Sequence, residues 1–371
     1  MRTRDAVLEY QKVLSDAGTV TIDLDLVDPV SAIELEFEAT NGATSNKGNF
    51  ISDVITKVEV VDGSDVLCSL NMLELEALQF YKTGKTPALF PSEFASGLQR
   101  HAALLLFGRH LWDPDYAMDF TRYKNPQLKI TSNLAAVRAV GATGFVTATL
   151  KATAVAKVME QLGSKPSKFL MQKELESFTS AASGDKRIQL PTDYVYRMLM
   201  LRAYVQLSDV DEVITDVKLT ADTDAFIPFN RKLKQLDAQV FSRWGAGRIK
   251  HDIFTSHQIA FRLMWNKEPS LDAWSWEDAT PEIVGIRYTW SSEGKLDLTD
   301  NAGAVISTDM KLTTVEEGHA LHATLPIPFG LMDQPATWFN PKTHKKLELV
   351  LTQAVASAVC QVVAEQERPI G

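Results

Sequence analysis

The chain has 371 residues, of which 45% are hydrophobic and 23% are charged, and its formal net charge is −9. This length suggests two or three domains, and the acidic balance without long basic runs argues against direct nucleic-acid binding, which needs clustered cations. No stretch reaches the ~18 uninterrupted apolar residues of a membrane span, and the N-terminus lacks the apolar core of a signal peptide.

The N-terminal segment shows helical spacing. Within residues 5–17, apolar side chains recur at intervals of three and four, and Gly18 is a natural stop signal for a helix. We therefore predict an N-terminal amphipathic helix within residues 1–18.

The first half then reads as a series of strands. Residues 20–26 and 33–39 alternate strictly between apolar and polar side chains, which is typical of half-buried strands. Residues 60–66, "VVDGSDV", contain an Asp-Gly turn that favours a hairpin. One helix follows near 71–82, and further strands are expected at 101–109, 126–132 and 144–156. These elements define a first domain at 19–161.

The amino-acid composition changes at residues 162–187, which are rich in polar and small side chains. We interpret this segment as a linker that contains one short helix at 167–178. A second domain at 188–371 again shows many short strands with turn signals. Because strands and helices do not alternate regularly, the chain is predicted to be all-β, with two antiparallel sandwiches in tandem.

Two segments of the chain are similar to each other. Residues 53–84 read "DVITKVEVVDGSDVLCSLNMLELEALQFYKTG", and residues 212–245 read "EVITDVKLTADTDAFIPFNRKLKQLDAQVFSRWG". A strand, an acidic turn, a helix and a closing glycine recur in the same order, with an offset of 159 residues before a two-residue insertion and 161 after it. This pattern indicates that the chain contains a duplication.

Candidate catalytic or metal-binding groups are scattered. His319 and His322 have a spacing that could bind a metal on a helix, but their segment looks like a strand, whose successive side chains point to opposite faces. Residues 297–303, "DLTDNAG", favour an ordinary Asx-type turn over a calcium loop, because the longer loop pattern is missing. Glu34, Glu36 and Glu38 could form a glycosidase-like pair, but their alternation favours a solvated strand face.

Two other residue types bear on function. Cys68 and Cys360 lie in apolar runs, so we expect buried free thiols and no disulfide. The tryptophans of the second half suggest core or subunit-interface packing, with a sugar-stacking platform as the alternative. The candidate interface aromatics are Trp265, Trp274, Trp276 and Trp290.

The duplicated strand-turn-helix units, on two tandem sandwiches without an active site, resemble the double jelly-roll major capsid proteins of adenovirus and of tailless, membrane-containing icosahedral bacteriophages. The resemblance implies two eight-stranded jelly rolls with a few short helices. It also implies homotrimers of pseudo-hexagonal outline that tile an icosahedral shell over an internal membrane. The protein would then be a structural virion protein and not an enzyme, without cofactors, synthesised and assembled in the host cytoplasm.

The same resemblance suggests partners and positions. Neighbouring trimers, minor capsid proteins and vertex proteins would contact the chain, and the N-terminal helix would lie near the membrane on the inner face. The long turns at 40–50 and 266–282 are candidates for the outer surface. Alternatives are a minor capsid or vertex protein of the same lineage, or a tandem jelly-roll carbohydrate-binding protein or enzyme. The residues predicted to lie near the membrane are Arg2, Arg4, Tyr10, Lys12, Val13 and Leu14.

Overall fold

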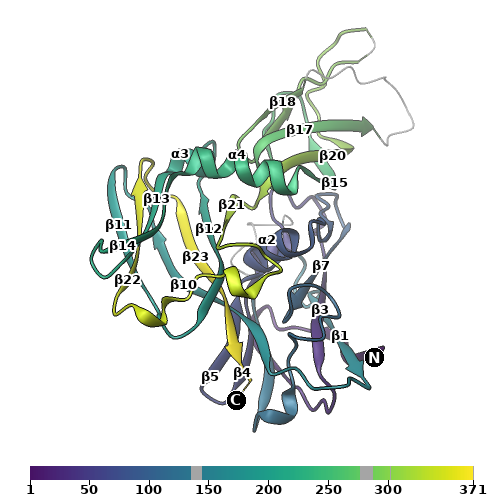
Figure 1. The fold of residues 1–371 in the computed structure, drawn as a ribbon. Helices are drawn as coiled ribbons and strands as arrows, with labels where there is room; N and C mark the ends of the chain where they lie inside the picture. Colours follow the sequence, from purple (N-terminus) through teal and green to yellow (C-terminus); the bar gives the residue numbers. More distant parts are fainter. Residues whose placement is uncertain (135–143, 276–286, 301, 371) are drawn as a thin grey trace.

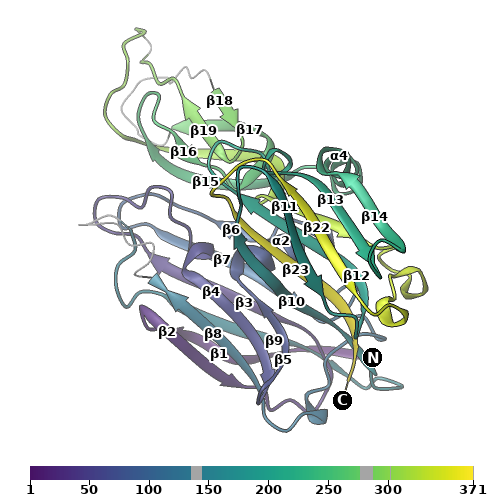
Figure 2. The same cartoon turned by 90° about the vertical axis from the view of Figure 1, so that its left-hand side faces the viewer.

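Two β-rolls stand side by side, and a smaller insertion projects from one end of the second roll (Figure 1). The computed structural model describes residues 1–134, 144–275, 287–300 and 302–370. Most of its regular structure is β-strand and its helices are short, which confirms the predicted all-β class. The two chain ends lie at the end of the molecule opposite the insertion (Figure 2).

The first roll packs one sheet, of strand order β1-β9-β3-β7-β6, against another, of order β2-β8-β4-β5. In β3, Ile33, Leu35 and Phe37 point into the core between these sheets, while the intervening glutamates stay partly exposed, as their alternation predicts. The strands are β1 Arg2–Val13, β2 Ala17–Asp23, β3 Val30–Thr40, β4 Ile55–Asp62, β5 Asp65–Leu70, β6 Ala88–Phe90, β7 Leu98–Leu106, β8 Pro126–Asn133 and β9 Lys151–Glu160.

The second roll repeats this topology except for β6, which has no counterpart in it. One of its sheets has the order β10-β23-β12-β21, and the other has the order β11-β22-β13-β14. Strand β10 also pairs in parallel with β5, so one sheet of each roll joins into a continuous eight-stranded sheet. The strands are β10 Lys168–Thr179, β11 Gly184–Leu190, β12 Val195–Tyr204, β13 Ile214–Ala221, β14 Phe226–Lys232, β21 Thr324–Pro328, β22 Leu347–Gln353 and β23 Val359–Pro369.

Each roll carries one longer helix directly after its β4–β5 or β13–β14 hairpin. Helix α2 begins at a capping box formed by Asn71 and Glu74, and both long helices end at a glycine of positive φ, Gly84 or Gly245. None of the described helices is long and apolar enough to span a membrane. The helices are α1 Ile51–Val54, α2 Met72–Thr83, α3 Val210–Val213 and α4 Leu233–Trp244, and the 3-10 turns are Phe120–Arg122, Pro335–Thr337 and Pro341–Thr343.

Irregularities in the strand ladders recur at equivalent places in the two rolls. The β1–β9 register shifts between Val7 and Glu9, and the β10–β23 register shifts between Glu174 and Glu176. Shifts also fall after Val30 in β3 and after Tyr196 in β12, and after the first residues of β4 and β13. Because bulges are specific features of a strand, three matching bulges strongly support the predicted duplication.

The hairpin registers refine the predicted alignment of the two rolls. Glu59 pairs with Ser69 in the first roll, and Lys218, at the offset of 159, pairs with Asn230 in the second. Asn230 is therefore equivalent to Ser69, and not to Asn71 as the sequence alignment suggests. The two-residue insertion lies in the turn between β13 and β14 and not behind Asn230.

The insertion separates α4 from β21 and was not foreseen in the sequence. Its described residues form two three-stranded sheets, β15-β20-β17 and β16-β19-β18, around a small core that includes Ile253, Phe261 and Leu312. The long turn predicted at 266–282 is wrong for residues 266–275, which belong to β17, and its remainder lies outside the described residues. The strands are β15 Gly247–Thr255, β16 Phe261–Arg262, β17 Trp265–Ser275, β18 Arg287–Trp290, β19 Glu293–Leu296 and β20 Met310–Leu321.

Two predicted helices are wrong. Residues 5–17 fall largely in strand β1, and residues 167–178 in strand β10. In both strands a bulge interrupts the alternation of side chains, so apolar residues recur at intervals that resemble those of a helix. It follows that 1–18 is not a separate helical segment and that 162–187 is not a linker, since β10 and part of β11 lie within it.

Candidate assembly interface

The two histidines considered for metal binding lie within hydrogen-bonding distance of carboxylates on two helices. His319 Nε2 lies 2.8 Å from Asp237 Oδ1 of α4, and His322 Nε2 lies 2.5 Å from Glu76 Oε2 of α2. Within the described ranges, no group of three or more His, Cys, Asp or Glu side chains could hold a metal ion. The two histidines thus contact different helices.

The acidic residues considered as calcium ligands or as catalytic carboxylates take part in a turn and in surface ion pairs. Asp300 Oδ1 accepts hydrogen bonds from the backbone N–H groups of Ala302 and Ala304, at 2.9 and 2.7 Å, as expected for an Asx-type turn. Each glutamate of β3 faces outward and forms an ion pair with a basic residue of a neighbouring strand: Glu34 with Lys157, Glu36 with Arg100 and Glu38 with Lys151. A solvated strand face therefore explains these carboxylates.

The structure instead shows an extensive contact between the two rolls. Strand β10 of the second roll lies in a groove of the first roll, between β5 and the chain that follows β7. On one side Lys173 pairs with Ser69 of β5; on the other, the Leu170 N–H donates to the Phe107 carbonyl at 2.7 Å. Strand β10 of the second roll thus extends a sheet of the first roll.

A buried charge cluster lies beside this groove. Glu365 of β23 contacts both Lys82 of α2 and Arg197 of β12 at 2.5 Å, and all three side chains are about 1% exposed. Burial raises the pKa of Glu365, but the charges of Arg197 and Lys82 outweigh this effect and hold the pKa below its ordinary value. Burial also lowers the pKa of Lys82 to about 8, against the attraction of Glu365.

A second buried cluster surrounds Glu76 of α2. Its carboxylate accepts hydrogen bonds from Ser52 and lies within hydrogen-bonding distance of His101 and His322, the last from the second roll. Burial opposes ionisation of Glu76, but its bonds to the two histidines lower its pKa to about 2. Although Ser, His and Glu meet here, all lie inside the protein, so the cluster joins the rolls and is not open to a substrate.

The equivalent surface of the second roll is not covered by any element of the described ranges. Helix α2 lies between the rolls and buries nine of its twelve residues, whereas α4 buries only Leu233, Leu236, Asp237 and Val240 (Figure 1). Phe80 of α2 is 1% exposed, whereas its sequence counterpart Phe241 is 44% exposed. Strand β14 is also largely exposed, while most of β5 is buried.

This surface is hollowed. A groove of about 520 Å³ runs between β14, α4 and the segment 328–340. Aromatic rings line much of it, from Phe229, Trp244, Phe329, Trp338 and Phe339. The groove corresponds in position to the one that β10 fills in the first roll. An uncovered apolar groove of this kind is typical of a protein–protein contact.

The N-terminal site residues lie on β1 and at its end. Arg2 and Arg4 both lie near Glu160 of β9, and Lys12 lies 3.1 Å from Glu9. Tyr10 and Val13 are exposed, whereas Leu14 is buried in the core of the roll. The predicted apolar stripe is therefore divided between surface and interior, and membrane proximity of this segment stays a prediction.

The tryptophans do not form one cluster at a surface. Trp265 is fully buried and contacts Phe80 of α2 at a centroid distance of 5.4 Å, so it is a core residue and cannot anchor another subunit. Trp290 is half-buried under the ammonium group of Lys295. The Trp274 side chain and Trp276 lie outside the described residues.

Sequence reasoning missed the residues that join the rolls, above all Lys82, Arg197 and Glu365. One sequence signal could have located the end of the groove: "LFG" at 106–108 recurs as "PFG" at 328–330. In the structure, the Phe107 N–H donates to Ser31 and the Phe329 N–H to the equivalent Arg197 carbonyl, both at 3.0 Å. These motifs mark the same turn in each roll.

Comparisons of the whole chain define the fold. Neither a protein-family model nor a curated protein sequence matches it. Solved structures do: the chain in the crystal structure of the STIV major capsid protein is 10% identical, with a TM-score of 0.58, over 99% of this chain and 96% of that one. The major capsid protein of bacteriophage PM2 is 12% identical, with a TM-score of 0.53, over 100% and 98% of the two chains.

A third similar structure is that of the PBCV-1 virus capsid, with 11% identity and a TM-score of 0.54 over 99% of this chain and 93% of that one. These neighbours are viral double jelly-roll major capsid proteins. The chain therefore has the double jelly-roll fold, as the sequence resemblance predicts, and the coverage extends over both rolls and the insertion.

Proposed function

We propose that the chain is a structural virion protein, the major capsid protein of an icosahedral virus, and that it assembles as a homotrimer. The observation that carries this proposal is the duplicated roll, in which the inter-roll face of the first roll is covered and the equivalent face of the second is open. The full-length likeness to capsid proteins supports the same function. A structural role requires no catalytic group or cofactor.

The duplication suits a hexagonal lattice. Three chains supply six similar rolls, so a threefold particle offers six nearly equivalent sides to its neighbours. A contact between the open face of one chain and the first roll of the next is heterologous, and such contacts close into a ring when the rotation between subunits permits. We expect these trimers to tile a shell, where minor capsid and vertex proteins fill the remaining positions.

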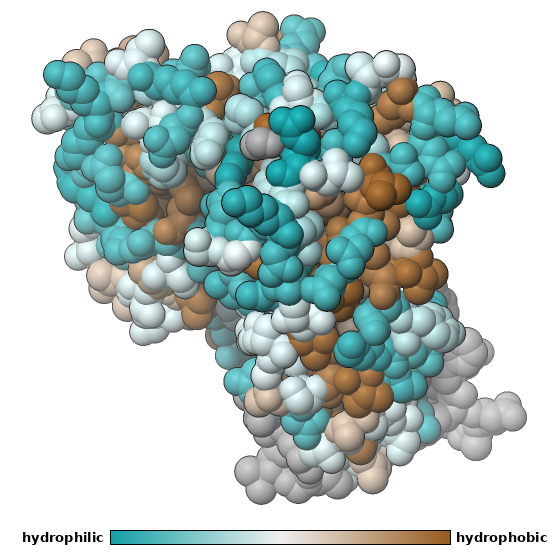
Figure 3. Space-filling model, turned by 90° about the horizontal axis from the view of Figure 1, so that it is seen from below, coloured by the Kyte–Doolittle hydropathy of each residue, from teal (hydrophilic) through white to brown (hydrophobic). Residues whose placement is uncertain are grey.

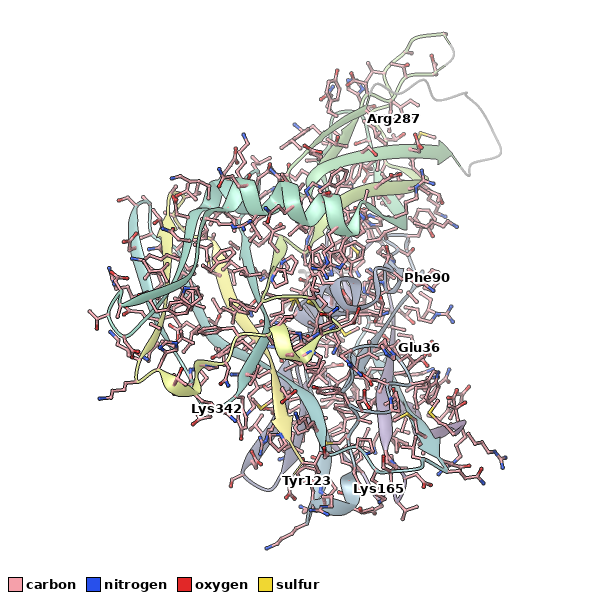
Figure 4. All side chains as sticks on the ribbon, viewed as in Figure 1. Glu36, Phe90, Tyr123, Lys165, Arg287 and Lys342 are labelled. Atoms are coloured by element: carbon pink, nitrogen blue, oxygen red, sulfur yellow. The ribbon has the colours of Figure 1, made fainter. Side chains whose placement is uncertain are left out.

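The two ends of the molecule differ, because only one of them carries the insertion (Figure 1). The insertion, which carries Arg287, lies at one end, and Tyr123 and Lys165 lie at the other (Figure 4). We propose that the insertion faces outward and that the opposite end faces the interior, where an internal membrane would lie. From this end, hydrophobic side chains surface in clusters between hydrophilic ones (Figure 3). If this end faces the membrane, Arg2 and Arg4 lie near it.

Sedimentation equilibrium of the purified protein at micromolar concentration tests the proposal. The expected species contains three 41.2-kDa chains. A stable monomer under these conditions would exclude the proposed building block. Counting copies per purified particle then separates the major capsid protein from a minor or vertex protein, since only the major protein forms most of the shell.

A further inference from the structure

The contact between the rolls predicts the contact between copies of the chain. Strand β10 has two neighbours: it pairs antiparallel with β23 of its own roll and parallel with β5 of the other roll. Its counterpart β1 pairs with β9 and is otherwise an edge strand. Strand β14, the counterpart of β5, is also an edge strand of its sheet. The contact between the rolls joins β10 to β5. The counterparts of these two strands, β1 and β14, lie at separate surfaces of the chain, and each has a free edge in the described structure.

The matching bulges fix which residues are equivalent. Aligning the bulge after Val7 with the bulge after Glu174 places Ala6 at the position of Lys173. The hairpin registers place Asn230 at the position of Ser69. Because Lys173 pairs with Ser69 within the chain, the equivalent pair between two copies joins Ala6 and Asn230.

We propose that β1 of one copy binds in the groove of a second copy as an added parallel strand beside β14, with Ala6 opposite Asn230. This inference rests on the proposed self-assembly and names the surfaces that carry it. The Thr3 N–H then takes the role of the Leu170 N–H and donates to the Phe329 carbonyl, which corresponds to Phe107. Main-chain hydrogen bonds provide affinity in such strand addition, and side-chain pockets provide specificity.

The chemistry of the two surfaces supports a second copy as the occupant. The outer side of β1 exposes Val7 at 65%, Tyr10 at 73% and Val13 at 53%. On the groove side, Phe226 of β14 lines the groove and is 48% exposed. Joining the surfaces would cover apolar groups of both and would remove two unpaired strand edges, which otherwise invite uncontrolled association.

Disulfide trapping tests the register. The double variant Ala6→Cys/Asn230→Cys is oxidised as the purified full-length protein and analysed on a denaturing gel without reductant. Neighbouring strands lie about 4.8 Å apart, within the Cα separation that a disulfide spans. The expected product is a covalent trimer that reductant converts to monomer. The two native cysteines are buried and interfere little.

Two matched variants serve as controls. Ser69→Cys/Lys173→Cys places the same pair within one chain and should form an internal disulfide, which shows that this geometry reacts. Ala6→Cys/Arg187→Cys uses an exposed residue of β11, on the opposite edge of the sheet from β14, and should form no trimer.

The outcomes separate this inference from the proposed function. If the chain sediments as a trimer and the internal control forms, but the Ala6/Asn230 pair does not cross-link, the proposed strand pairing is wrong while the trimer stands. If the protein sediments as a monomer and shows no cross-link, both proposals fail. Cross-linking by the Arg187 control to the same extent would also refute the register.

Discussion

Replacing Glu365 with glutamine should strongly destabilise the fold, because this carboxylate balances two buried cations. Lys82 and Arg197 both contact it at 2.5 Å, and all three side chains are about 1% exposed. Removing one partner of a buried ion pair costs about 3–5 kcal/mol. The loss should reach this range near neutral pH, since glutamine keeps the shape of the side chain and leaves both cations without a counter-charge.

The pH dependence of the stability loss shows whether the uncompensated charge of Lys82 causes it. Burial lowers the pKa of Lys82 to about 8, from 10.5, so this side chain can lose its charge more easily than an exposed lysine. Without Glu365 its pKa should fall further. The stability difference between wild type and variant should therefore shrink as the pH rises from about 7 to about 9.

Urea unfolding followed by circular dichroism measures the loss. Glu9→Gln is the matched control, because it removes the partly exposed pair with Lys12, and surface pairs contribute at most about 1 kcal/mol. If Glu365→Gln unfolds at the wild-type urea concentration, or if its deficit grows with pH, the account of this cluster is refuted.

Three further predictions concern a close glycine contact, a helix cap and a buried carboxylate. Gly247→Ala should cost about 1–3 kcal/mol, because the added Cβ would lie 2.3 Å from the Trp265 ring, whereas Gly163→Ala meets open space and should be neutral in urea unfolding. Asn71→Ala should cost about 1 kcal/mol through loss of the α2 cap, whereas Lys232→Ala at the start of α4, which forms no side-chain cap bond, should cost little in the same assay. The pKa of Glu76 is about 2 in the folded chain against an ordinary 4.5, so the stability it contributes is present above about pH 4.5 and is lost as the pH falls toward 2. Glu76→Gln should remove this part of the acid sensitivity in a pH series of unfolding midpoints, and an unchanged acid slope would contradict the assignment.

The sequence predicts those elements whose local signals agree with their tertiary surroundings. The alternation at 33–39 gives β3, the Asp62-Gly63 turn joins β4 to β5, and the capping residues of α2 mark its start. The duplication could also be recognised, because both copies keep the strand, turn and helix in order. These features depend on residues that are close in the sequence.

The errors arise where structure depends on distant partners. A bulge at Leu8 and another at Leu175 interrupt the alternation of β1 and β10, so both strands resemble helices until β9 and β23 are in place. The insertion could not be separated from the second roll, because its short strands carry the same pattern as those of a roll. The buried cations could not be recognised either, since nothing local to Lys82 indicates Glu365, which lies far along the chain.

Electron microscopy of the purified protein tests the central claim most directly. If three duplicated chains form the building block, class averages should show a threefold particle with six lobes in a near-hexagonal outline. Three projections should rise from one side, one for the insertion of each chain. Particles with two lobes and a single projection would show isolated chains and would contradict the account.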